Sequence, residues 1–144
     1  MRARNRLRWL LATALCGMTL AAQAEVYLVV AANSPVQSLT RKDAINLYTG
    51  RTRQLASGQM VQALDLPRDD ALRGEMYWLL TGQTLAQVNS YWSRLTFTGQ
   101  TRALPTSGSE AEVIETLRNN PLALGYVSRE PVNRGLRVVL VLKE

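Results

Sequence analysis

The strongest constraint on the fold is an uninterrupted apolar run at residues 26–32, which reads V-Y-L-V-V-A-A. The turn-forming residues Asn33, Ser34 and Pro35 follow it directly. A run of this length and composition predicts a buried strand that ends in a turn. Because no position in the run is polar, both faces of this strand need cover, which favours a layered α/β architecture.

The rest of the chain alternates between short apolar runs and segments with the apolar spacing of helices. We expect further strands at residues 60–64, 122–127 and 136–142, and helices at 40–50, 69–80, 84–99 and 109–120. Thr40 with Asp43 and Ser109 with Glu112 have the spacing of helix-capping pairs. Trp92 falls on the apolar stripe of its helix and is expected in the core. The predicted fold class is therefore α/β, with a central mixed sheet flanked by helices.

Residues 1–24 have the pattern of an export signal and are expected to lie outside the fold. Arginines occupy positions 2, 4, 6 and 8, an uncharged apolar core spans residues 10–20, and Ala22-Gln23-Ala24 forms a small-x-small cleavage site. The apolar core is shorter than the ~18 residues that a membrane anchor requires. We expect cleavage after Ala24, a single domain at 25–144, a periplasmic location and no membrane insertion of the exported part.

Charge and residue types exclude several classes of function. Four of the 17 basic residues lie in the signal and all 11 acidic residues follow it, so the exported part has a net charge of only +2. The remaining cations are scattered rather than arranged in a stripe with aromatics, which argues against nucleic acid. The chain has no histidine, and its one cysteine, Cys16, lies in the signal, so His-based and thiol catalysis are excluded. The spacing of Asp65, Asp69 and Asp70 is not that of a calcium loop, and we expect neither metal nor cofactor.

Two segments carry a resemblance to a known family. Residues 39–51 read L-T-R-K-D-A-I-N-L-Y-T-G-R, and residues 89–99 read N-S-Y-W-S-R-L-T-F-T-G, followed by a loop, a helix and N-P-L-A-L-G-Y-V at 120–127. In this order the motifs resemble the second lobe of the phosphate-binding, type 2 periplasmic binding proteins of ABC transporters. The resemblance implies that the chain is one such lobe standing alone.

The segment that should hold phosphate departs from the family. There, a strand ending in Arg-x-Asp leads into Gly-Ser-Gly-Thr-Thr at a helix start, where N–H groups and hydroxyls bind the anion. Here residues 63–70 read A-L-D-L-P-R-D-D, and of the motif only Asp65 is retained. Asp69 and Asp70 at a helix start already satisfy the helix dipole and would repel phosphate. The family also traps its ligand between two lobes, and this chain has the length of one.

We therefore expect a non-enzymatic periplasmic module that binds a small anion or, preferably, a protein partner of the envelope or a second copy of itself. Tyr77 and Trp78 are the candidate partner-contact residues, because neighbouring aromatics are typical of protein interfaces. A small hydrolase is the least supported alternative, since the chain offers no histidine base.

The main alternative is a phosphate or oxyanion receptor with a rebuilt site. Its candidate ligands are Ser34, Thr40, Arg41, Lys42 and Asp65. Arg41 and Lys42 stand at a helix start, where the dipole favours an anion over a cation. The same pair is equally explained by side chains that point into water beside Asp43.

Overall fold

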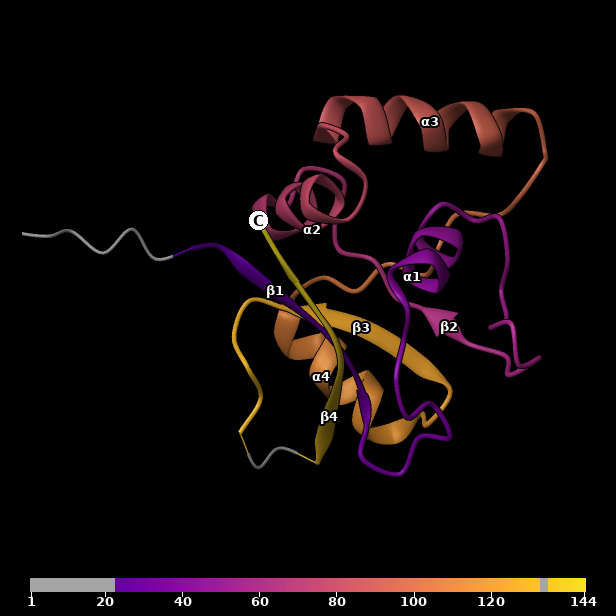
Figure 1. Ribbon diagram of the computed structural model, residues 1–144. Helices are drawn as coiled ribbons and strands as arrows, with labels where there is room; N and C mark the ends of the chain where they lie inside the picture. Colours follow the sequence, from indigo (N-terminus) through magenta and orange to yellow (C-terminus); the bar gives the residue numbers. More distant parts are fainter. Residues whose placement is uncertain (1–22, 133–134) are drawn as a thin grey trace, which may run out of the picture.

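The computed structural model describes residues 23–132 and 135–144, which pack around one hydrophobic core. Figure 1 shows the arrangement of the four strands and four helices. In chain order they are β1 (Glu25–Ala31), α1 (Arg41–Tyr48), β2 (Gln62–Ala63), α2 (Ala71–Thr81), α3 (Leu85–Phe97), α4 (Glu110–Asn119), β3 (Ala123–Val127) and β4 (Leu136–Lys143). The predicted element order and the α/β fold class are confirmed.

The four strands form one mixed sheet with the order β2-β3-β1-β4. β1 is central and pairs antiparallel with both β3 and β4, whereas β2 pairs parallel with β3. The register of β1 with β4 shifts between Leu28 and Val29, so Val139 of β4 is an extra residue in the ladder. The carbonyl oxygen of Val139 accepts a hydrogen bond of 3.1 Å from the Leu39 backbone N–H, so the segment before α1 covers part of the β4 edge.

Helices cover both faces of the sheet. α4 packs against β3 and β1 on one face, and α2 packs against β1 and β4 on the other, next to α1 (Figure 1). α3 lies beyond α2 and forms an outer layer that does not cover the sheet itself. The apolar sequence of β1 after Glu25 follows from this arrangement, because the strand has helices on both sides.

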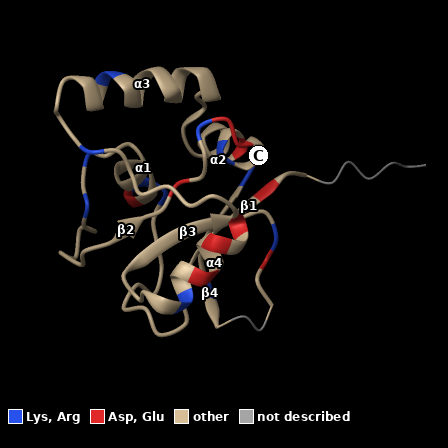
Figure 2. Cartoon of the chain, turned by 180° about the vertical axis from the view of Figure 1, so that it is seen from behind, with Lys and Arg blue, Asp and Glu red and all other residues tan. Residues whose placement is uncertain are grey.

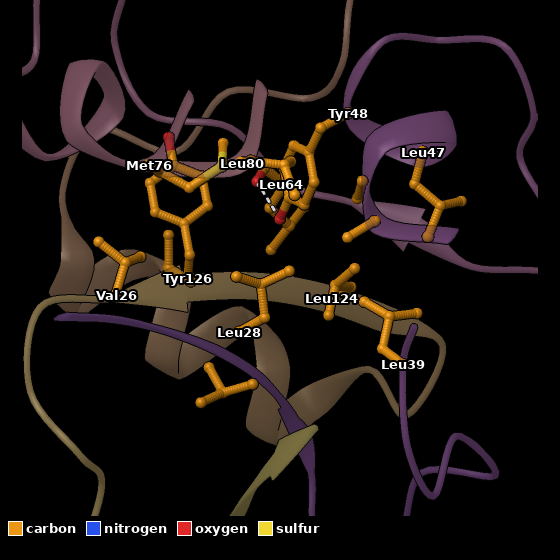
Figure 3. Close-up of a cluster of buried hydrophobic side chains, with 14 of the residues drawn as sticks. Val26, Leu28, Leu39, Leu47, Tyr48, Leu64, Met76, Leu80, Leu124 and Tyr126 are labelled. Carbon is orange, nitrogen blue, oxygen red and sulfur yellow. Dashed lines mark hydrogen bonds between the residues drawn. The ribbon is translucent and has the colours of Figure 1, made fainter. Parts of the chain in front are cut away.

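The core between the sheet and helices α1 and α2 is closed by large side chains that are almost entirely buried. Figure 3 shows that strand residues such as Leu28 and Leu124 point toward Tyr48 of α1 and Met76 of α2. The Tyr48 hydroxyl donates a hydrogen bond of 3.2 Å to the Leu64 carbonyl, which satisfies its polar end inside the core. Trp92 of α3 is also buried, as its place on the apolar stripe predicts.

Most element boundaries differ by one or two residues from those expected, and the structure explains the differences at β2 and α2. β2 has two residues rather than the expected five, because the chain around it forms isolated bridges instead, Gln54 with Met60 and Asp65 with Thr106. α2 begins at Ala71 rather than residue 69, because the Asp70 side chain accepts hydrogen bonds from the N–H groups of Leu72 and Arg73 and so acts as the N-cap.

Residues 1–22 of the expected export signal at 1–24 lie outside the described part of the chain, so the signal and its cleavage after Ala24 stay predictions. Among the helices at 23–132 and 135–144, none has the length and apolar character needed to cross a membrane.

The contact between α4 and β3 depends on a missing side chain at Gly125. A Cβ atom placed there would lie 2.4 Å from Cγ1 of Val113 and 3.4 Å from Cδ1 of Leu117. Gly125 therefore allows α4 to approach the sheet more closely than any other residue would.

Gly125→Ala is expected to destabilise the fold by about 1–3 kcal/mol, the usual cost of overpacking a core. Urea unfolding measures the change. In a Val113→Ala background the clashing methyl is gone, so adding Gly125→Ala should cost clearly less than it does in the wild type. Equal costs in both backgrounds would contradict the proposed clash.

Candidate functional site

A buried carboxylate follows β2, where the resemblance places the phosphate site. Asp65 is only 5% exposed. One oxygen, Oδ2, accepts from Arg73 Nε at 2.9 Å and lies 3.1 Å from the Tyr77 hydroxyl. The other, Oδ1, accepts from the Tyr126 hydroxyl at 2.6 Å and from the Leu66 backbone N–H at 2.9 Å. Both carboxylate oxygens are therefore fully used by the protein itself.

Arg73 of α2 is the counter-ion of this carboxylate. Its Nη1 atom donates to Asn89 Oδ1 of α3 at 2.7 Å and to the Arg68 carbonyl at 3.1 Å. The guanidinium also lies 5.1 Å from the centre of the Tyr77 ring, a cation–π distance. Burial alone would lower the pKa of Arg73, but the charge and hydrogen bond of Asp65 outweigh it and raise the pKa. Arg73 thus stays charged and ties α2 to α3 and to the end of β2.

Three buried tyrosines surround the ion pair. The Tyr48 ring meets those of Tyr77 and Tyr126 edge-on, at centroid distances of 6.2 and 5.7 Å. Burial, and then the negative charge of Asp65, raise the pKa of all three hydroxyls. They therefore remain neutral hydrogen-bond donors, and none is available as a base or nucleophile.

A small pocket opens beside this cluster. Its volume is about 130 Å³, and its lining includes Asp65, Arg73, Asn89, Trp92 and Leu104. Pockets that hold small-molecule ligands typically measure about 300–1,000 Å³. Within residues 23–132 and 135–144, no group of three or more Asp, Glu, His or Cys side chains could hold a metal ion. The hydrogen bonds of the cluster join α2, α3 and β3 inside the fold.

All four helix starts are occupied by side chains of the protein. The capping residues are Thr40 for α1, Asp70 for α2, Thr84 for α3 and Ser109 for α4, each accepting from a backbone N–H of the first turn. α4 carries a further carboxylate: Glu112 accepts from the Gly108 N–H at 2.6 Å. At each helix start at least one N–H group of the kind that binds anions in phosphate sites is therefore paired with a side chain, and at α2 two are paired with the carboxylate of Asp70.

The residues proposed for a rebuilt anion site have local structural roles. Ser34 is buried, and its Oγ accepts from the Val36 N–H at 3.1 Å, which shapes the turn after β1. Thr40 Oγ1 caps α1 and donates to Asp43 Oδ2 at 2.7 Å. Lys42 is exposed. Asp65 belongs to the buried cluster and shares no hydrogen bond with the other candidates among the described residues. An anion site made of these residues stays a prediction.

The position of Arg41 at the start of α1 has an explanation inside the fold. Its Nη2 atom donates to the Leu79 carbonyl in the last turn of α2. A cation at the C-terminal end of a helix complements the dipole and the unpaired carbonyl groups there. Arg41 therefore stabilises the C-terminal end of α2, and its place in the first turn of α1 does not by itself indicate a bound anion.

The candidate partner surface needs a correction. Tyr77 is 1% exposed and belongs to the core, because the side chain turns inward to Asp65 and Tyr48. Trp78 is 51% exposed and remains available at the surface. Adjacent residues on a helix point about 100° apart, so the pair could not share one face.

The sequence contained a signal for two members of the cluster that the motif analysis missed. Arg73 lies three and seven residues before Met76 and Leu80, so it sits on the apolar face of α2. Asn89 lies next to Val88 and three residues before Trp92, on the buried face of α3. A charged and an amide side chain on two apolar faces indicate a buried polar contact, since such groups are buried only with partners. Tyr126 gave no such signal.

Comparison with known proteins finds similarity in three-dimensional structure but no significant match to a family model or a curated protein. Three solved structures are similar over 81% of this chain, at TM-scores of 0.59–0.61. They are a phosphate-bound protein from Clostridium perfringens assigned as a phosphate ABC transporter substrate-binding protein (15% identity), an ABC-type phosphate transport receptor from Vibrio cholerae (17%), and PstS from Borrelia burgdorferi (14%).

The fold is that of one lobe. The matches cover 45%, 46% and 47% of the three solved chains, so this chain spans about half the length of the proteins it resembles. The resemblance to phosphate-binding substrate-binding proteins, drawn from two sequence motifs, is confirmed as a similarity of fold.

Removing one charge of the buried ion pair is expected to destabilise the fold more than removing both charges. Arg73→Met leaves Asp65 buried without a counter-ion and is expected to cost about 3–5 kcal/mol of unfolding free energy. Asp65→Asn in the same chain removes the stranded charge. The double variant should then be more stable than Arg73→Met alone in urea unfolding. A double variant as unstable as the sum of both single changes would show that the two groups are not coupled.

Proposed function

We propose that this chain is a non-enzymatic binding module of the periplasm whose ligand is a protein partner rather than phosphate. The fold supports a binding role, because the structural neighbours are substrate-binding proteins rather than enzymes. The predicted export signal supports the location. The absence of histidine from the chain and the full pairing of the Asp65 cluster argue against the hydrolase alternative.

One observation carries the choice of a protein over phosphate. At the position that resembles the family's phosphate loop, the start of α2 is capped by the carboxylate of Asp70, and the preceding carboxylate of Asp65 is neutralised by Arg73. A phosphate placed there would have to displace Asp70 from the helix start and would meet Asp69 as well. Both steps oppose binding through like-charge repulsion and lost hydrogen bonds.

A phosphate or oxyanion receptor with a rebuilt site remains the alternative function. It would draw on Arg41 and Lys42, the two cations at the start of α1. Arg41 would first have to leave the Leu79 carbonyl at the end of α2.

Phosphate is expected to leave the thermal stability of residues 25–144 unchanged relative to sulfate or chloride at the same ionic strength. A ligand present at 100 times its dissociation constant would add about 2.7 kcal/mol. Differential scanning calorimetry detects a shift of that size readily. A shift specific to phosphate would overturn the proposal in favour of the receptor, and its loss in Arg41→Ala/Lys42→Ala would locate the rebuilt site.

Trp78 is the proposed contact residue for the partner, since half of its side chain is solvent-exposed on α2. Trp78→Ala should change the unfolding free energy little, yet abolish retention of the partner by immobilised protein from envelope extracts. Glu115→Ala on α4, which covers the opposite face of the sheet, is the control and should retain the partner. Retention unchanged by Trp78→Ala would exclude this residue as the contact. Light scattering during size exclusion tests whether the partner is a second copy.

A further inference from the structure

We propose that a second surface, the arginine face, binds an acidic segment of a partner protein. The arginine face consists of Arg51, Arg53, Arg94 and Arg102 together with Phe97 and Met60. The inference rests on the proposed function, because it names the chemistry of the protein that such a module would recognise. The face lies on the connection between α1 and β2, on α3, and on the loop that follows α3.

Two hydrogen bonds bring these three segments together. Arg53 Nη2 donates to the Arg102 carbonyl at 3.2 Å, which joins the α1–β2 connection to the loop after α3. Tyr91 of α3 donates to the Thr49 carbonyl at 2.6 Å, so that side of α3 faces the chain just before Arg51. Arg94 lies three residues after Tyr91 and three before Phe97, and residues at this spacing are neighbours on a helix surface.

Charge on the molecule is unevenly distributed. Residues 44–64 and 76–109 contain no aspartate or glutamate at all, whereas residues 110–115 contain three glutamates. Figure 2 shows acidic residues on α4, near β1, on α1 and around the start of α2, while α3 and the connection that follows it carry only basic ones. All four arginines of the face are exposed, and none has a carboxylate partner among residues 23–132 and 135–144. Such a surface attracts carboxylates and repels other cations.

The residue types favour a protein as the occupant. Every cation of the face is an arginine, whose planar fork binds carboxylates with two hydrogen bonds. Phe97 is 94% exposed, and Met60, in the bridge beside Arg53, is 52% exposed. Arginine, methionine and aromatic residues are enriched at protein interfaces, where lysine, aspartate and glutamate are depleted. A membrane-surface site would instead require a broad apolar face next to the cations.

Binding of a fluorescein-labelled, glutamate-rich peptide that contains leucine and tyrosine tests the inference by fluorescence anisotropy. Arg94→Glu/Arg102→Glu should weaken binding by at least about tenfold, equivalent to about 1.4 kcal/mol. Arg118→Glu/Arg129→Glu on the α4 side changes the net charge by the same amount and should weaken binding by less than about twofold. Phe97→Ala should weaken it without altering the salt dependence. Circular dichroism confirms that each variant is folded.

Three outcomes overturn the inference. Equal weakening by both charge-reversal pairs would show a response to net charge alone. Co-sedimentation with phosphatidylglycerol vesicles without peptide binding would assign the face to an anionic lipid surface. Absence of binding to peptide and vesicles would leave the face without a ligand of this chemistry. In each case the phosphate and Trp78 experiments are unaffected, so failure here is distinct from failure of the proposed function.

Discussion

The structure depends on a single carboxylate, Asp65, which is almost entirely buried. Asp65 follows the shortest strand of the sheet, and its two oxygens are held by Arg73 of α2 and Tyr126 of β3, among others. Taking these charges out of water is costly, and the loss is offset only when every hydrogen-bonding position is filled. The cluster therefore fixes the positions of α2, α3 and β3 relative to one another, because moving any of them leaves a buried charge or hydroxyl unpaired.

The elements that could be predicted from sequence are those that local chemistry decides. The β1 strand was predicted from an apolar run that needs cover on both faces, and α3 from a stripe that includes Trp92. β2 was predicted too long, because its length is set by pairing with β3, a partner about 60 residues later in the chain. Tyr77 was assigned to the surface together with Trp78 because neighbouring aromatics are typical of protein interfaces, whereas a hydroxyl with buried acceptors is stable inside.

Asp65 was identified from the sequence as a candidate site residue, but its role in a buried ion pair was not predicted. The sequence does not distinguish an aspartate that binds a ligand from one that neutralises a buried arginine. The structure does, because Asp65 forms an ion pair with Arg73, which lies eight residues later on α2. The cluster pairs the polar groups of Asp65, Arg73 and Asn89 inside the core, so recognition of another protein would use the exposed surfaces.

The central position of β1 has a consequence for the time course of folding. This strand comes first among the elements, yet its two neighbours, β3 and β4, come last, and β4 is separated from it by about 100 residues of chain. Pairing between such distant segments is slow, since a long loop must close before any contact forms. The sheet is therefore assembled only after the final residues of the chain are free to pair. Until then both edges of β1 are open, which exposes a largely apolar strand to pairing with other chains.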